Sequence, residues 1–152
     1  MMRSPAETMG ASRASHIALQ QTLVNLAVLA ADTKQAHWNL HGPTFVSLHR
    51  YLDELAEVLR DDADLLAERL AAVGGSPDGR TVTLANTTTL DPFPSGPLGA
   101  DKALRALDAS LGRVTADITE SLDADAGPVT LQLFTTVLEH LEKHRWLIRS
   151  HG

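Results

Sequence analysis

Proline and glycine punctuate this chain of 152 residues in a way that restricts its fold to a few long helices. Both residues interrupt helices, proline because it removes a backbone hydrogen bond and glycine because of its conformational freedom. Between the interruptions lie four segments rich in Ala and Leu, which favour helices. The predicted helices span residues 15–40, 44–73, 100–122 and 128–150.

Apolar residues recur at helical spacing in the later segments, as expected for helices that bury one face. The stripe of the second segment consists of Leu48, Leu52, Leu55, Leu59, Leu66 and Leu70. The third segment carries Leu104, Leu107, Leu111, Val114 and Ile118, and the fourth carries Leu131, Phe134, Leu138, Leu141 and Leu147. Because aromatic residues make up only 4% of the chain, we expect an all-α fold with an aliphatic core.

The connection between the second and third segments is too long for a simple up-and-down bundle. Residues 76–99 are rich in Pro, Gly and Thr, and we predict a long crossover that contains no more than one short helix. Two helical hairpins joined by one long crossover are typical of ferritin-like four-helix bundles. The first residues are small and polar, so we expect a flexible N-terminal tail over 1–14 and one bundle domain over 15–152.

Charge and cysteine content exclude several classes of protein. The formal net charge of −6 argues against binding to polyanions through net attraction. The absence of Cys excludes disulfides, thiolate zinc sites and a cysteine nucleophile. The longest apolar run, residues 26–31, is far shorter than the roughly 18 residues of a membrane span. The N-terminus also lacks the apolar stretch of a signal peptide, so we expect a cytoplasmic protein without a membrane partner.

The second helix carries four potential metal ligands on one side. His49 and Asp53 are four residues apart, and Asp64 and Glu68 repeat that spacing. Their mean direction lies roughly 140° from the leucine stripe, so they point away from the core of their own chain. Residues 49 and 68 are about 28 Å apart along the helix axis. The two pairs therefore cannot bind one metal ion within a single chain.

A second copy of the chain would bring the two pairs together. Both pairs are symmetric about a point between Val58 and Leu59. An antiparallel copy of the helix, related by a two-fold axis at this point, would place His49 beside the partner's Glu68. Each of two identical sites would then hold one imidazole and three carboxylates, a set that suits Fe(II), Mn(II) or Zn(II). The alternative is a solvated acidic face, which is the usual meaning of acids at helical spacing.

The remaining histidines give weaker signals. His37 and His41 are four residues apart on the first helix, but His37 is in phase with the apolar positions there and reads as a core histidine. His140 and His144 form a similar pair on the last helix, for which we favour a surface position. The Glu-x-x-His motif of ordinary di-iron bundles is absent, so the interior of the bundle is expected to lack a metal site.

The segment from Lys34 to Pro77 closely resembles the Dps family, the DNA-binding proteins from starved cells, which are ferritin-like mini-ferritins. The matching motifs are K-Q-x-H-W-N, G-x-x-F-x-x-L-H-x-x-x-D, D-x-x-x-E-R and G-G-S-P, and a weaker similarity covers most of the chain. The resemblance implies that His37, His49 and Asp53 are ferroxidase ligands from one subunit, completed by Asp64 and Glu68 of its two-fold mate. It thereby replaces the core interpretation of His37, and it identifies Trp38 as the tryptophan beside the site.

The resemblance also implies the activity and the assembly. We expect a hollow dodecamer that oxidises Fe(II), preferably with hydrogen peroxide, and stores the ferric product as mineral, which would protect the cell from oxidative damage. Zn or Mn could occupy the same site. The implied metal chemistry agrees with the ligands, because carboxylates hold the harder Fe(III) more strongly than Fe(II).

The chain departs from the family pattern in two places. Residues 1–14 contain two Arg and no Lys, so the Lys-rich tail with which many members bind DNA is missing. DNA binding is therefore doubtful, and association with the nucleoid would depend on it. Acids that line the iron-entry pore in other members are also absent from the start of the fourth helix, which leaves Asp123 and Asp125 as pore candidates. A solvated turn is the alternative for these two residues.

Overall fold

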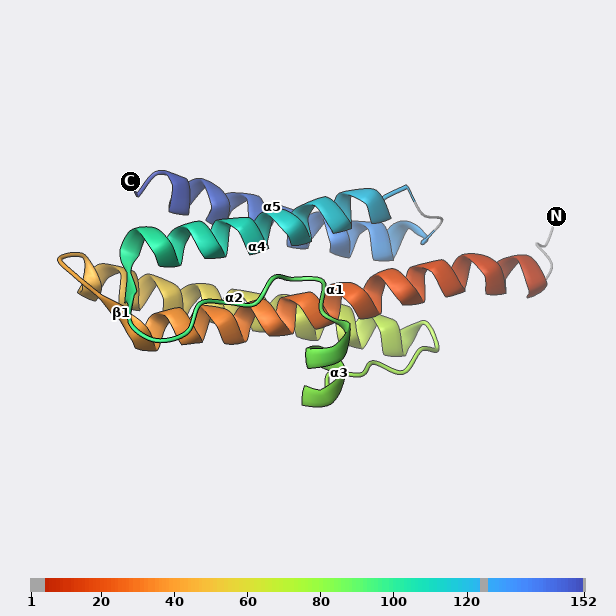
Figure 1. Cartoon of the computed structure of the whole chain (residues 1–152). Coiled ribbons are helices and arrows are strands. Elements are labelled where there is room, and N and C mark those ends of the chain that lie inside the picture. Colours follow the sequence, from red (N-terminus) through yellow and green to blue (C-terminus); the bar gives the residue numbers. More distant parts are fainter. Residues whose placement is uncertain (1–4, 124–125, 152) are drawn as a thin grey trace.

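Two helical hairpins pack side by side in the structure, a computed structural model that describes residues 5–123 and 126–151 (Figure 1). The first hairpin consists of α1 (Pro5–Asn39) and α2 (Phe45–Ala72). The second consists of α4 (Ala100–Ser121) and α5 (Pro128–Arg149). The predicted all-α, ferritin-like bundle is thus confirmed, and most helix ends lie within two residues of the predicted ones.

The start of α1 is the exception. The helix begins at Pro5, ten residues before the predicted start at Ser15, so the backbone of most of the expected tail is helical. Proline suits the first turn of a helix, and a single Gly10 among alanines is too weak an interruption to stop one. The N-terminal part of α1 extends beyond the ends of the other helices (Figure 1). Residues 1–4 lie outside the described part of the chain.

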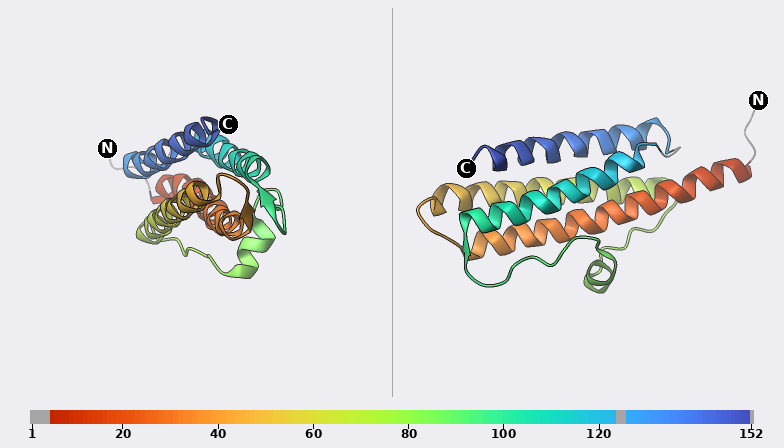
Figure 2. Two further views of the ribbon diagram at one scale, coloured as in Figure 1. Left: turned by 90° about the vertical axis from the view of Figure 1, so that its left-hand side faces the viewer. Right: turned by 45° about the horizontal axis from the view of Figure 1, so that its top comes forward.

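The crossover returns the chain from the end of α2 to the start of the second hairpin. It contains the single short helix that was predicted, α3 (Thr81–Thr87), and then runs along α1 (Figures 1 and 2). At its end β2 (Leu98–Gly99) pairs in parallel with β1 (Leu40–His41), which follows α1 directly. The end of α1 and the start of α4 are therefore held at the same end of the bundle.

The core is aliphatic, as expected. Every residue of the predicted stripes on α2 and α4 is buried. On α5 the prediction is only partly right, because Leu131, Leu138 and Leu147 are half-buried. The buried face of α5 is centred instead on Phe134, Val137, Leu141 and Ile148. The buried face of α5 is thus rotated about the helix axis relative to the predicted stripe, and His144 points inward.

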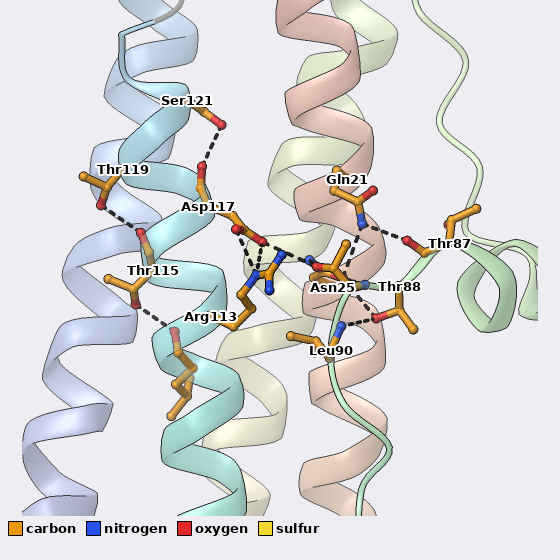
Figure 3. A network of polar contacts seen from close by, with 12 residues as sticks. Gln21, Asn25, Thr87, Thr88, Leu90, Arg113, Thr115, Asp117, Thr119 and Ser121 are labelled. Carbon is orange, nitrogen blue, oxygen red and sulfur yellow. Dashed lines mark hydrogen bonds and ion pairs between the residues drawn. The ribbon is translucent and has the colours of Figure 1, made fainter.

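A polar network attaches the crossover to the first helix (Figure 3). Asn25 on α1 is 1% exposed, and its amide nitrogen donates to the hydroxyl of Thr89 at 2.9 Å. Its amide oxygen accepts from the Thr88 hydroxyl and the Thr89 backbone N–H, at 3.0 and 3.1 Å. Because a buried amide needs such partners, Asn25 fixes the register of the crossover against α1.

The α1 helix is long and apolar enough, over Arg13–Asn39, to cross a membrane by length and composition alone. Half of the relevant window is buried inside the bundle, however. A central helix of a four-helix bundle has the same properties, and the burial of α1 against α2 and α4 accounts for its apolar character.

Candidate metal centre

Two histidines from neighbouring helices fix each other at one end of the first hairpin. His37 lies near the end of α1 and His49 in the first turns of α2. The Nδ1 atom of His37 lies 2.6 Å from the backbone oxygen of His49, and the Nδ1 atom of His49 lies 2.8 Å from the backbone oxygen of His37. A carbonyl oxygen can only accept, so each Nδ1 carries a proton and donates it. Each imidazole thereby holds the other in place.

This arrangement prepares both rings for metal binding. With the proton on Nδ1, the lone pair of a neutral imidazole is on Nε2, which is the atom left for a metal ion. Neither Nε2 atom has a hydrogen bond to another described residue. The two rings are stacked, with centroids 3.7 Å apart and an angle of 13° between their planes. His37 is buried, as its periodicity predicted, but its ring is turned toward His49 and not into the leucine core.

A carboxylate and an ammonium group complete this cluster. Asp53, one turn after His49, forms an ion pair with Lys34, which lies one turn before His37. The hydrogen bond from Lys34 is the main reason why the pKa of Asp53 is lowered, and its charge and the two imidazoles act in the same direction. Asp53 is therefore ionised, and Lys34 holds the position that a cation would take.

The other two predicted ligands lie elsewhere on the same helix. Asp64 and Glu68 are exposed on α2, about three and four turns beyond Asp53. Among the described residues of one chain, no three His, Asp or Glu side chains converge closely enough to hold a metal ion. That two chains share each site stays a prediction from the spacing.

Large apolar side chains are exposed around the cluster. Trp38, which follows His37, is 68% exposed, and Val46 at the start of α2 is 60% exposed. At the other end of the hairpin Ile17 is 63% exposed, and Val82 on α3 is 58% exposed. Large apolar side chains that stay exposed at both ends of the hairpin favour contact with another molecule.

Comparison with known proteins gives the family. The family model of the Ferritin-like domain matches residues 17–151. The DNA protection during starvation protein of Agrobacterium fabrum is 35% identical over 136 residues, which are 88% of this chain and 84% of the relative. The chain belongs to the Dps family. Among solved structures, Dps92 from Deinococcus radiodurans superposes with a TM-score of 0.89 at 33% identity, covering 93% of this chain and 87% of that one.

A second similar structure is that of a Dps protein in a high iron form. Dps from Microbacterium arborescens, described in its high iron form, has a TM-score of 0.88 and 25% identity, and the match covers 93% of each chain. Membership in the Dps family assigns this chain, in general terms, to iron binding, iron storage and protection against oxidative damage.

The Dps subunit has a second polar cluster between α2 and α5. Asp62 is 2% exposed, and His140 donates to its carboxylate at 2.8 and 3.1 Å. Nearby, the Tyr51 hydroxyl contacts Nδ1 of His144 at 2.9 Å. The surface position predicted for the two histidines is wrong for His144, which is buried, because it is in phase with Leu141 and Ile148 on the inner face of α5.

Burial controls the titration of this second cluster. It raises the pKa of Asp62, which the hydrogen bond from His140 partly counteracts. It lowers the pKa of His144, as do the neighbouring charges of Lys143 and His140. Burial and the charge of Glu54 raise the pKa of Tyr51 to about 12. Tyr51 and His144 are therefore neutral at pH 7, and together with Asp62 and its donor His140 they tie α2 to α5.

The pore candidates stay a prediction. Asp123 is exposed just after α4, where the chain turns toward α5. Asp125 lies outside the described residues. At the end of this turn Gly127 adopts a φ of 78° and precedes Pro128, the first residue of α5. Lys34 is the residue of the metal centre that sequence reasoning did not assign, and its spacing of three residues from His37 was the available signal.

Proposed function

We propose that this Dps protein is a ferroxidase whose iron site forms between two subunits. His37, His49 and Asp53 would come from one subunit, and Asp64 and Glu68 from its two-fold mate. The observation that carries this proposal is the mutual fixation of the two imidazoles, which leaves both Nε2 atoms free beside an ionised carboxylate. The exposed apolar side chains around the cluster support burial of this face against a second copy.

Fe(II) is the substrate in this proposal. An incoming Fe(II) ion replaces the Lys34 ammonium at Asp53 and takes the Nε2 atoms as further ligands. Hydrogen peroxide is the preferred oxidant: two Fe(II) ions each give up one electron, the O–O bond breaks, and two protons are taken up to form two water molecules. Carboxylates stabilise the harder Fe(III), which favours oxidation. Zn(II) or Mn(II) would compete for the same donor atoms.

The storage role requires a closed shell of subunits. We propose the dodecamer of the family, with twelve chains enclosing a ferric mineral in the cytoplasm. Twelve copies would carry a formal charge of −72, twelve times the −6 of one chain. Such a particle attracts Fe(II) and repels DNA, so we propose that it does not bind DNA at physiological salt. A gel-shift measurement that finds DNA bound at that salt would contradict this part.

The oxidation proposal is tested with Fe(II) and peroxide. The wild type should form a soluble ferric core and increase in mass at constant subunit number. A His49→Ala/Asp53→Ala variant should assemble to the same mass but oxidise Fe(II) much more slowly. His41→Ala is the matched control, because His41 is exposed and makes no side-chain hydrogen bond among the described residues. Equal oxidation rates in the wild type and the double variant would refute the site.

A further inference from the structure

A groove of about 450 Å³ lies at the end of the first hairpin opposite the histidine pair. Its walls come from the first turns of the buried part of α1, from the end of α2 and from α3. Val24 and Leu70 form its floor and are almost fully buried, whereas Ile17 at its rim is 63% exposed. Polar atoms of Ser76 and Asp78 line one side. The groove is mostly apolar and open, and no other part of the chain that the structure describes occupies it.

The groove is an apolar hollow, whereas Trp38 at the other end of the hairpin is an exposed apolar side chain. It is 68% exposed, so a large aromatic surface that folding normally buries is left without a partner in one chain. Within the same chain, residues 17 and 38 are about 31 Å apart along α1. Trp38 therefore cannot reach the groove of its own subunit.

The two-fold axis of the proposed function relates these two positions. On α2 the axis passes between Val58 and Leu59. His37 lies level with His49 across the hairpin, and His16 at the start of the bundle lies level with Val73, whose backbone oxygen is 3.0 Å from its Nε2. Because α1 and α2 are antiparallel, the two pairs place the axis on α1 between about six and ten residues before His37.

This register sets the contact between two copies of α1. The axis therefore falls between residues 27 and 31, with Ile17 and Trp38 roughly two to four turns away on either side. The α1 helices of the two subunits therefore face each other in antiparallel orientation. The indole of one subunit is brought to the level of residues 17–23 in the other, the stretch of α1 that lines the groove.

We infer that the groove receives Trp38 of the partner subunit, once on each side of the two-fold axis. The apolar floor would cover the indole, and the Ser76 hydroxyl would accept its N–H, which a buried indole requires. The inference rests on the proposed function, because it uses the same axis. Since Trp38 directly follows His37, docking would hold the end of α1 in place, so that the groove of one subunit supports the iron ligands of the other.

Cross-linking tests this contact directly, because the chain has no native Cys. An Ile17→Cys/Trp38→Cys variant treated with a short bismaleimide should give covalent dimers on a denaturing gel, since the two positions are too far apart to link within a chain. An Ile17→Cys/Trp146→Cys variant is the control, because Trp146 is 63% exposed on α5. On the denaturing gel it should run as the monomer. Absence of dimers from the first variant at wild-type native mass would overturn the inference, as would equal dimer yields from both.

Fluorescence supplies a second measurement on an undisturbed groove. In a Trp146→Phe variant, Trp38 is the remaining tryptophan. Its emission should be blue-shifted in the assembled particle, and acrylamide should quench it several-fold less than after dissociation. An Ile17→Glu substitution in this background should reverse both effects. An emission typical of exposed tryptophan in an assembled particle would overturn the inference.

Iron oxidation by the same Trp146→Phe protein separates the two proposals. If it oxidises Fe(II) at the wild-type rate while Trp38 is exposed, the groove contact is refuted and the ferroxidase proposal stands. If Trp38 is buried but Fe(II) is not oxidised, the contact stands and the ferroxidase proposal is refuted.

Discussion

The pair of Asp62 and His140 gives the sharpest stability prediction. Asp62 is 2% exposed and has no other side-chain hydrogen bond among the described residues. A His140→Ala substitution would leave a buried carboxylate without its donor. Loss of a hydrogen bond to a charged group costs about 1.5–3 kcal/mol, and breaking a buried ion pair costs about 3–5 kcal/mol. His140 is 44% exposed, which admits water, so we expect the free energy of unfolding to fall by about 2–3 kcal/mol at neutral pH.

The sign of the pH dependence follows from the direction of the Asp62 shift. Burial raises the pKa of Asp62 above its ordinary value of 3.8, so the native state keeps this proton to higher pH than the unfolded state does. The contribution of Asp62 to stability is therefore present in acid and is lost as the pH rises through its native pKa. Without His140 this pKa rises further. The deficit of the variant should thus be largest at neutral pH and shrink on acidification.

Urea unfolding between pH 4 and 7, at one protein concentration because assembly contributes to stability, measures this effect. At pH 7 the melting temperature should fall by about 5–10 °C, given 2–4 °C per kcal/mol for a chain of this size. An Asp62→Asn/His140→Ala variant should lose the pH dependence, and His151→Ala should change stability by less than about 0.5 kcal/mol. A deficit in His140→Ala that is independent of pH would refute the reasoning.

Three further outcomes are expected. Lys34→Met should bind Zn(II) up to about fivefold more tightly at neutral pH, because Lys34 no longer competes for Asp53. Without its main hydrogen-bond donor the pKa of Asp53 rises, so acid should release the metal at a higher pH than in the wild type. Titration calorimetry measures both effects. Gly127→Ala should lower the free energy of unfolding by about 1–2 kcal/mol, because its φ of 78° disfavours a Cβ. Asn25→Leu removes three hydrogen bonds of 2.9–3.1 Å and should cost about 2–3 kcal/mol in urea unfolding.

Much of the fold could be predicted because helix ends are local events. Pro and Gly mark the ends of α2, α4 and α5, and leucine spacing identifies the buried faces of α2 and α4. The start of α1 was missed because residues 5–14 are polar enough to resemble a tail, while their backbone propensity favours a helix. The buried face of α5 depends on how two other helices meet it, so its stripe was only partly right.

The metal centre could likewise be predicted only in part. The spacing of His49 and Asp53 is a property of one helix, so the sequence contains it. The ion pair of Lys34 with Asp53 and the reciprocal bonds of His37 and His49 depend on the register between α1 and α2. No periodicity within one helix contains that register. The carboxylates of Asp64 and Glu68 would act in the site of a second chain, and this role stays a prediction.

The distribution of the proposed ligands along the chain has a consequence for folding. All of them lie on the first hairpin, between residues 37 and 68, and the two histidines that fix each other are only twelve residues apart in the sequence. Joining β1 to β2 instead requires closure of a loop of about sixty residues, which carries a larger entropic cost. We expect the hairpin to form before the crossover is secured. A nascent or partly folded subunit would then display its half of the iron site early, and metal could bias which subunits pair.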